Sequence, residues 1–215
     1  MAFTGWPDEA IAFYEGLEAD NTKAYWTAHR ERWDACVLGP MEELLDELEP
    51  QFGRGKVFRP YRDVRFSKDK TPYKTACGAT LGEGYVQFSA RGLAVGSGYY
   101  HLASDQLERY RQAVADDTTG AELAAIVADT EAQGVTVHGS EPLKTAPRGY
   151  PKDHPRIDLL RCKGLIVWRE WPVGPWLATP AAKQRVVEVL EAAKPMRGWL
   201  DRHVGPSEEP PERRR

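Results

Sequence analysis

The sequence is poor in cysteine, and its cysteines form no metal-binding or redox pattern. The three of them, Cys36, Cys77 and Cys162, are spread over 215 residues. A disulfide framework needs pairs of cysteines and a structural zinc site needs closely spaced ligands, so the spacing argues against both. The five histidines show no metal-ligand spacing either. We therefore expect reduced thiols, no metal site and no cofactor.

Long apolar runs are also missing. No stretch approaches the roughly 20 apolar residues that cross a bilayer. The beginning, MAFTGWPDEAIAFYEGL, lacks the basic and apolar regions of a signal peptide. The formal net charge is −3, so no global field draws the chain onto a lipid surface or a nucleic acid. We expect a cytoplasmic protein without a membrane partner, in which any attraction for anions is local.

Common catalytic signatures are absent. The sequence contains no Gly-x-x-x-x-Gly-Lys-Ser/Thr, no His-Glu-x-x-His, no Gly-x-Ser-x-Gly, and no Gly-x-Gly-x-x-Gly after an expected strand. These absences argue against a P-loop nucleotidase, a zinc hydrolase, a serine esterase and a Rossmann dehydrogenase.

What the sequence does contain is the composition of an ordinary globular protein, with 41% hydrophobic and 28% charged residues. Apolar spacing and capping signals predict helices that begin near residues 8, 21, 40, 104, 119, 155 and 180, the second of them capped by Asn21. Alternation and turn signals predict strands at 57–58, 64–66, 85–90, 93–100, 135–137 and 165–168, with a tight hairpin at Arg91–Gly92.

The order of these elements predicts the fold class. Helices come first, then strands joined by short turns, then mostly helices, which is typical of an α+β fold with helices packed on a mainly antiparallel sheet. No repeat or linker divides the sequence, so we expect a single domain over residues 1–205. The ending PSEEPPERRR, residues 206–215, is expected to be a disordered tail.

Positive charge is concentrated in one segment. Residues 54–74 hold eight Lys or Arg against two Asp, a local balance of +6. Such a cluster repels itself, and either acidic helices or a bound anion could compensate it. If residues 62–66 form a strand, Asp63 and Arg65 share one face, and Asp63 would orient the Arg65 guanidinium through a bidentate pair.

A small anionic, phosphate-bearing ligand is the first functional hypothesis. Lys supplies a point charge, Arg a planar fork, and the turn after Phe66 adds backbone N–H groups and a hydroxyl. The residues expected to bind the anion are Arg62, Asp63, Arg65, Ser67, Lys68, Lys70 and Lys74.

Whether chemistry follows binding is left open by the sequence. If the protein is an enzyme, we expect acid–base or transfer chemistry assisted by these cations. The candidate acids and bases are Asp153 and His154, at the end of a long loop, and Tyr73. The simpler interpretation of Asp153 and His154 is local capping and hydrogen bonding. Cys77 lies three residues after Lys74 and is more simply an inert buried thiol than a reactive one.

Three alternatives explain the same segment without a small anion. The cations could pair with the acidic residues of the third expected helix, at positions 42, 43, 46, 47 and 49. They could contact the phosphates of a nucleic acid while Tyr61, Phe66 or Tyr73 stacks on bases. They could also dock an acidic protein partner. The sequence does not decide the oligomeric state.

Several stretches resemble a family of bacterial and fungal proteins known as domain of unknown function 2461. RDVRFSKDKTPYKT (62–75) resembles its signature, and FYEGLEADNTKAYWTAHRERWD, GSGYYHLASDQLERYR and LKTAPRGYPKDHPRIDLLRCKGL match its pattern elsewhere. Together they cover most of the chain, from about Phe13 to Leu165. The resemblance implies a single α+β domain; it implies no reaction and no ligand.

Overall fold

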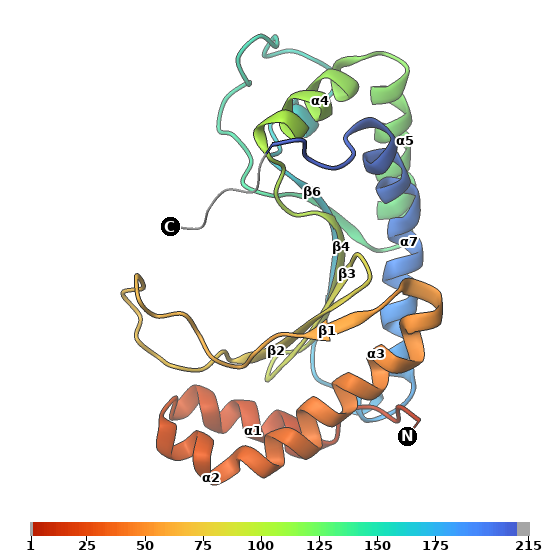
Figure 1. The fold of residues 1–215 in the computed structure, drawn as a ribbon. Helices are drawn as coiled ribbons and strands as arrows, with labels where there is room; N and C mark the ends of the chain where they lie inside the picture. Colours follow the sequence, from red (N-terminus) through yellow and green to blue (C-terminus); the bar gives the residue numbers. More distant parts are fainter. Residues whose placement is uncertain (1, 210–215) are drawn as a thin grey trace. The chain divides into compact units, whose positions relative to one another are not determined.

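The computed structural model describes residues 2–209 and contains both helices and strands (Figure 1). The helices are α1 (Asp8–Ala19), α2 (Lys23–Trp33), α3 (Gly39–Phe52), α4 (Ser104–Ala115), α5 (Thr119–Ala132), α6 (Ile157–Leu160) and α7 (Ala181–His203). The strands are β1 (Gly55–Val57), β2 (Ala76–Leu81), β3 (Gly84–Ser89), β4 (Gly92–Tyr99), β5 (Thr136–Gly139) and β6 (Leu165–Trp171), in the sheet order β1-β2-β3-β4-β6-β5. The predicted α+β class with an antiparallel sheet is confirmed.

Contacts between residues divide the chain into two compact units. The first unit comprises residues 1–95 and 170–188, and the second comprises residues 96–169 and 189–215. The boundaries fall within β4, β6 and α7, so each of these elements contributes residues to both units. The single domain expected over residues 1–205 stays a prediction.

The first unit begins with the helices that the apolar spacing predicts. The N-cap of α2 is Thr22, whose side-chain oxygen accepts a hydrogen bond from the Tyr25 N–H at 3.2 Å. The prediction of Asn21 as this cap is therefore wrong, because the helix begins one residue later. A short π-helix, Asp34–Leu38, joins α2 to α3, and Pro40 lies in the first turn of α3, where a missing N–H costs no hydrogen bond.

Strands β1, β2 and β3 form an antiparallel meander whose two faces differ. Gly55 pairs with Leu81, and Ala76 pairs with Ser89. Side chains alternate between the faces, and one set packs into the core, with Phe88 stacked on Trp6 at 4.9 Å. The opposite face carries Ala76, Gly78, Tyr85, Gln87 and Ser89. This second face, away from the Trp6 core, is where the candidate site lies.

Two strand predictions require correction in this unit. Residues 64–66 form no strand, because the segment between β1 and β2 pairs only through an isolated bridge between Tyr61 and Tyr73. Strand β2 was not predicted, since its sequence ACGATL has small residues and no clear alternation. The predicted hairpin is present one residue earlier than expected, with its turn at Ala90–Arg91.

The second unit has its own core and its own capping interactions. Tyr110 is fully buried, and the Trp199 indole N–H donates to the Thr119 carbonyl at 2.9 Å. Arg156 donates to the carbonyls of Val114 and Ala115, which satisfies carbonyl groups at the end of α4.

Part of the expected tail has defined contacts in this unit. The Asp105 carboxylate accepts hydrogen bonds from the Ser207 hydroxyl at 2.7 Å and the Glu208 N–H at 2.8 Å. The rest of the expected tail, residues 210–215, lies outside the described residues. Within residues 2–209, no helix combines the length and the apolar character needed to span a membrane.

Candidate functional site

The basic segment forms a long loop between β1 and β2, which we call the basic loop (residues 58–75). Figure 1 shows it running out beyond the ends of the two strands and back again. Its base is held by backbone hydrogen bonds from the Phe58 N–H to the Gly78 carbonyl and from the Lys74 N–H to the Pro60 carbonyl, both at 2.8 Å. The two limbs of the loop therefore start from a fixed position on the sheet.

One limb of the basic loop is anchored to the helices by Asn21. The Asn21 side-chain amide donates to the Tyr73 carbonyl and accepts from the Tyr73 N–H, each at 3.1 Å. This reciprocal pair imitates the pairing of a β-strand. The Tyr73 ring stacks on Trp26, with centroids 4.4 Å apart and planes 8° apart. Asn21 therefore positions the returning limb of the loop, a role that the sequence did not predict.

Two arginines of the basic loop are neutralised inside the loop. Arg65 donates to both carboxylate oxygens of Asp63, at 2.9 and 2.7 Å, so the expected bidentate pair exists without the expected strand. Arg62 hydrogen bonds to Asp69 and to Thr71. These arginine hydrogen bonds are the main reason why the pKa of each carboxyl is lowered from 3.8 to about 2.

Two further cations, Lys68 and Lys70, lie at the outer end of the basic loop, which we call its tip. The Lys70 ammonium donates to the Val64 carbonyl at 2.8 Å, and Lys68 is exposed. Among residues 2–209, no ion pair joins the basic loop to α3. The alternative in which acidic residues of the third helix compensate the cluster therefore finds no contact in this part of the chain.

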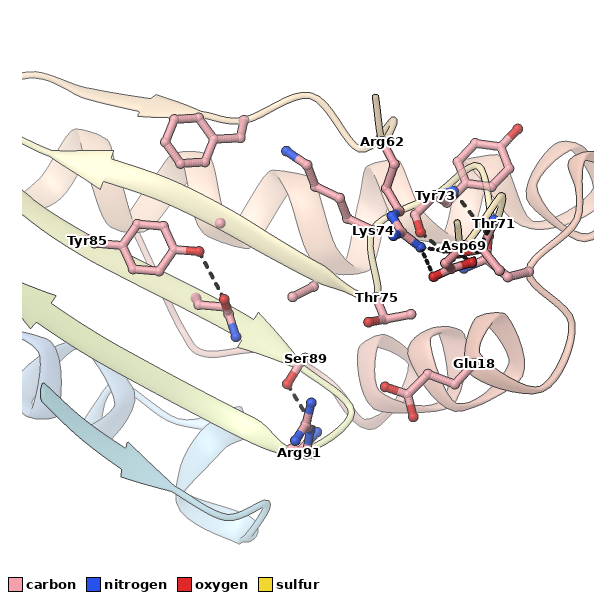
Figure 2. A pocket seen from close by; sticks show the side chains of 15 residues that line it. Glu18, Arg62, Asp69, Thr71, Tyr73, Lys74, Thr75, Tyr85, Ser89 and Arg91 are labelled. Carbon is pink, nitrogen blue, oxygen red and sulfur yellow. Dashed lines mark hydrogen bonds and ion pairs between the residues drawn. The ribbon is translucent and has the colours of Figure 1, made fainter. Parts of the chain in front are cut away.

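A cavity of about 630 Å³ lies where the basic loop returns to the sheet (Figure 2). Strands β2 and β3 provide one wall through Ala76, Gly78, Tyr85, Gln87 and Ser89. The other lining residues come from the basic loop, from the α1–α2 region and from the β3–β4 turn: Glu18, Asn21, Phe58, Arg62, Asp69, Thr71, Tyr73, Lys74, Thr75 and Arg91. All of these residues belong to the first unit.

The charge of the cavity is positive and unevenly compensated. Three cations, Arg62, Lys74 and Arg91, line it against two carboxylates, Glu18 and Asp69, which gives +1. Arg62 and Asp69 neutralise each other directly. Among the described residues, neither the Lys74 ammonium nor the Arg91 guanidinium has a carboxylate partner; the Lys74 nitrogen lies 5.5 Å from the centroid of the Phe58 ring. Lys74 and Arg91 are therefore the cations open to a ligand.

A comparison of the sequence with models of known protein families identifies the family of the chain. Residues 9–199 match the family model described as "Conserved hypothetical protein (DUF2461)". The chain belongs to this family. No curated protein and no solved structure matches it. The matched range of this DUF2461 member contains every residue that lines the cavity.

Only some of the ligand and catalytic residues that the sequence predicts line the cavity. Arg62, Lys74 and Tyr73 line it, whereas five predicted ligand residues of the loop do not: Asp63, Arg65, Ser67, Lys68 and Lys70. Sequence reasoning missed Arg91 and the polar row on β3. The alternation of residues 85–90, which placed Gln87 and Ser89 on one side, was the available signal for that row.

The candidate catalytic residues of the DUF2461 member lie in different settings. Asp153 and His154 belong to the second unit and do not line the cavity. The His154 ring nitrogen Nδ1 accepts from the Arg156 N–H at 3.1 Å, a local bond that shapes the turn before α6. Tyr73 is buried, and burial raises the pKa of its hydroxyl above the ordinary value. In Figure 2 the Tyr73 ring points away from Tyr85 and Ser89.

Cys77 lies buried on β2. Burial raises the pKa of Cys77 to about 12, so its thiolate is strongly disfavoured in spite of the nearby Lys74. Within residues 2–209, no group of three or more His, Cys, Asp or Glu side chains is placed to hold a metal ion.

Proposed function

We propose that this protein binds a small anionic, phosphate-bearing ligand in the cavity between the basic loop and the β2–β3 face. The observation that carries the proposal is a pair of cations without carboxylate partners, Lys74 and Arg91, in one cavity of about 630 Å³. This volume lies within the range of about 300–1,000 Å³ that is usual for small-molecule sites.

The chemistry of the two cations suits a phosphate. Lysine provides a point charge with three donors, and arginine provides a planar fork that matches phosphate oxygens. Each charge-assisted hydrogen bond contributes roughly 1.5–3 kcal/mol, so two or three such bonds together supply about 3–9 kcal/mol towards binding, from which the entropy of association is subtracted. Thr75 adds a hydroxyl to the cavity wall. The proposal concerns binding of the anion by a cytoplasmic protein and assigns no reaction.

A matched pair of lysine variants tests the proposal. Lys74→Met removes the ammonium that faces the cavity and keeps an apolar stem, whereas Lys68→Met removes the same charge from the exposed loop tip. Isothermal titration with inorganic phosphate, sugar phosphates, nucleotides and polycarboxylates at two salt concentrations measures both. We expect Lys74→Met to weaken binding of a phosphate-bearing probe about 10- to 100-fold.

The control separates a site from general attraction. Lys68→Met should bind as the wild type does, within about twofold, because an exposed charge outside the cavity is screened. Equal weakening by both variants would show that net charge, and not the cavity, attracts the anion. Absence of binding for every probe would remove the proposal.

A second candidate, binding of single-stranded nucleic acid, is favoured by the tip of the basic loop. Phe66 is 88% exposed there, and the Arg65 guanidinium lies 5.9 Å from its ring centroid. An exposed ring beside cations suits base stacking with phosphate contacts. Phe66→Leu should then weaken the binding of short oligonucleotides, while the binding itself should fall as the salt concentration rises.

A further inference from the structure

An aromatic shelf forms part of the cavity wall. Phe58, from the start of the basic loop, and Tyr85, from β3, both line the cavity, and their rings are stacked with centroids 6.1 Å apart and planes 29° apart. Phe58 is 38% exposed. The exposed part of this apolar ring borders the cavity and is accessible to a ligand.

A glycine makes room for this shelf. A Cβ atom at Gly78 would lie 2.5 Å from the Tyr85 hydroxyl oxygen and 3.2 Å from two atoms of its ring. Because glycine occupies this position, Tyr85 lies close over the neighbouring strand β2, where Gly78 pairs with Gln87. The position of Tyr85 in the shelf is therefore built into the pairing of β2 and β3.

The side-chain amide of Gln87 lies next to the shelf. The Tyr85 hydroxyl donates to the Gln87 side-chain oxygen at 2.9 Å, as Figure 2 shows for the labelled tyrosine. This bond uses the amide oxygen and leaves the two N–H donors of Gln87 for another partner within the cavity. Ring nitrogens and carbonyl oxygens at the edge of a nucleobase are suitable acceptors for such donors.

We infer that the anion bound in this cavity is a nucleoside phosphate. The exposed part of the Phe58 ring would contact the base, Gln87 would donate to its edge, and the cations that line the cavity, Lys74 and Arg91, would attract the phosphate. This inference rests on the proposed function, because it names the class of ligand for the same cavity. An inorganic anion would leave the aromatic shelf and the amide donors unused.

The size and the placement of charge agree with this ligand. The Lys74 nitrogen lies 5.5 Å from the centroid of the Phe58 ring, so a phosphate contacting the lysine stays within reach of a base on the shelf. A cavity of about 630 Å³ accommodates a mononucleotide with room for water. The same chemistry occurs in a free mononucleotide and at the end of a nucleic-acid strand, and we assign the free mononucleotide.

The decisive experiment compares probes that differ by the base. Isothermal titration of the wild-type chain uses adenosine and uridine monophosphates, ribose 5-phosphate, inorganic phosphate and a hexanucleotide. Stacking on one aromatic wall is expected to make a mononucleotide bind about tenfold more tightly than ribose 5-phosphate. This comparison in the wild type does not depend on the folding of any variant.

Two phenylalanine variants then locate the effect. Phe58→Leu should lose the preference for the mononucleotide and retain the affinity for ribose 5-phosphate, which also shows that the cavity is intact. Phe66→Leu makes the same substitution at the exposed loop tip, outside the cavity, and should retain the preference for the mononucleotide.

The outcomes distinguish this inference from the proposed function. Equal binding of ribose 5-phosphate and mononucleotides overturns the inference and leaves anion binding standing. Failure of every phosphate compound to bind overturns both. Binding of the hexanucleotide without either mononucleotide also overturns the inference and favours the nucleic-acid candidate. Preference for a mononucleotide that Phe58→Leu abolishes supports it.

Discussion

The substitution Asn21→Ser separates two roles that the sequence cannot distinguish. Serine is about as good an N-cap as asparagine, so the change would be nearly neutral if Asn21 capped α2. Serine is too short to donate to the Tyr73 carbonyl and accept from the Tyr73 N–H as the asparagine amide does. The structure therefore predicts that this mild substitution destabilises the protein.

The magnitude follows from the two hydrogen bonds. Both are 3.1 Å long and partly buried, and each contributes about 0.5–1.5 kcal/mol to the free energy of unfolding. We expect Asn21→Ser to lower the free energy of unfolding by about 1–3 kcal/mol. Urea denaturation followed by tryptophan fluorescence measures this loss as a lower midpoint at an unchanged slope.

Thr22→Ala supplies the matched comparison. It removes the observed cap of α2 and should cost about 1 kcal/mol without affecting the loop anchor. A loss below about 0.5 kcal/mol for Asn21→Ser would contradict the assigned anchor. The same result would also undermine the position of the returning limb, and with it the shape of the cavity.

Three further predictions concern the ionised, buried and close-packed groups of the first unit. The pKa of the Asp69 carboxyl is lowered from 3.8 to about 2, so its ion pair should stabilise the basic loop fully at pH values above about 3.8 and be lost as the pH falls through about 2. Carbon-detected NMR titration checks this prediction, and a titration midpoint near 3.8 would refute it. Cys77, whose pKa is raised to about 12, should resist alkylation by iodoacetamide at pH 8 in the native protein, whereas the half-buried Cys36 should react. Mass spectrometry measures the labelling, with urea-unfolded protein as the control, and labelling of Cys77 in the native protein would contradict its burial. Gly78→Ala should lower the free energy of unfolding by about 1–3 kcal/mol because the added methyl group meets Tyr85, and by much less when Tyr85 is also replaced by alanine. Equal losses with and without Tyr85 in this double-mutant cycle would argue against the close approach of Gly78 and Tyr85.

Local patterns in the sequence were sufficient for much of the fold. Apolar spacing predicts α1, α3 and the long last helix, because a helix must bury one face whatever it packs against. The β3–β4 hairpin was also predictable, since alternation and a two-residue turn are local properties. The pairing of Asp63 with Arg65 belongs to the same class, because the two residues are neighbours in sequence.

The strand errors show where local patterns fail. Residues 64–66 have the composition of a strand, but they lie in the basic loop, where no neighbouring strand supplies backbone partners. Strand β2 has the opposite property: its small residues carry a weak signal, and pairing with β1 and β3 makes it a strand. Sheet membership therefore depends on partners far away in the sequence.

The features of the candidate site also fall into those that local sequence predicts and those that depend on distant contacts. The sequence by itself determined that this protein is an α+β member of its family with a concentrated basic segment, because composition, periodicity and motifs are carried by neighbouring residues. Only the tertiary structure decided which cations line a cavity without a carboxylate partner: Lys74 and Arg91 do, while Arg62 is paired with Asp69 and Arg65 with Asp63. It also decided the role of Asn21, whose partner Tyr73 is 52 residues away. The physical reason is that a cavity and its anchors are made by contacts between distant segments, and no local pattern encodes which distant segments meet.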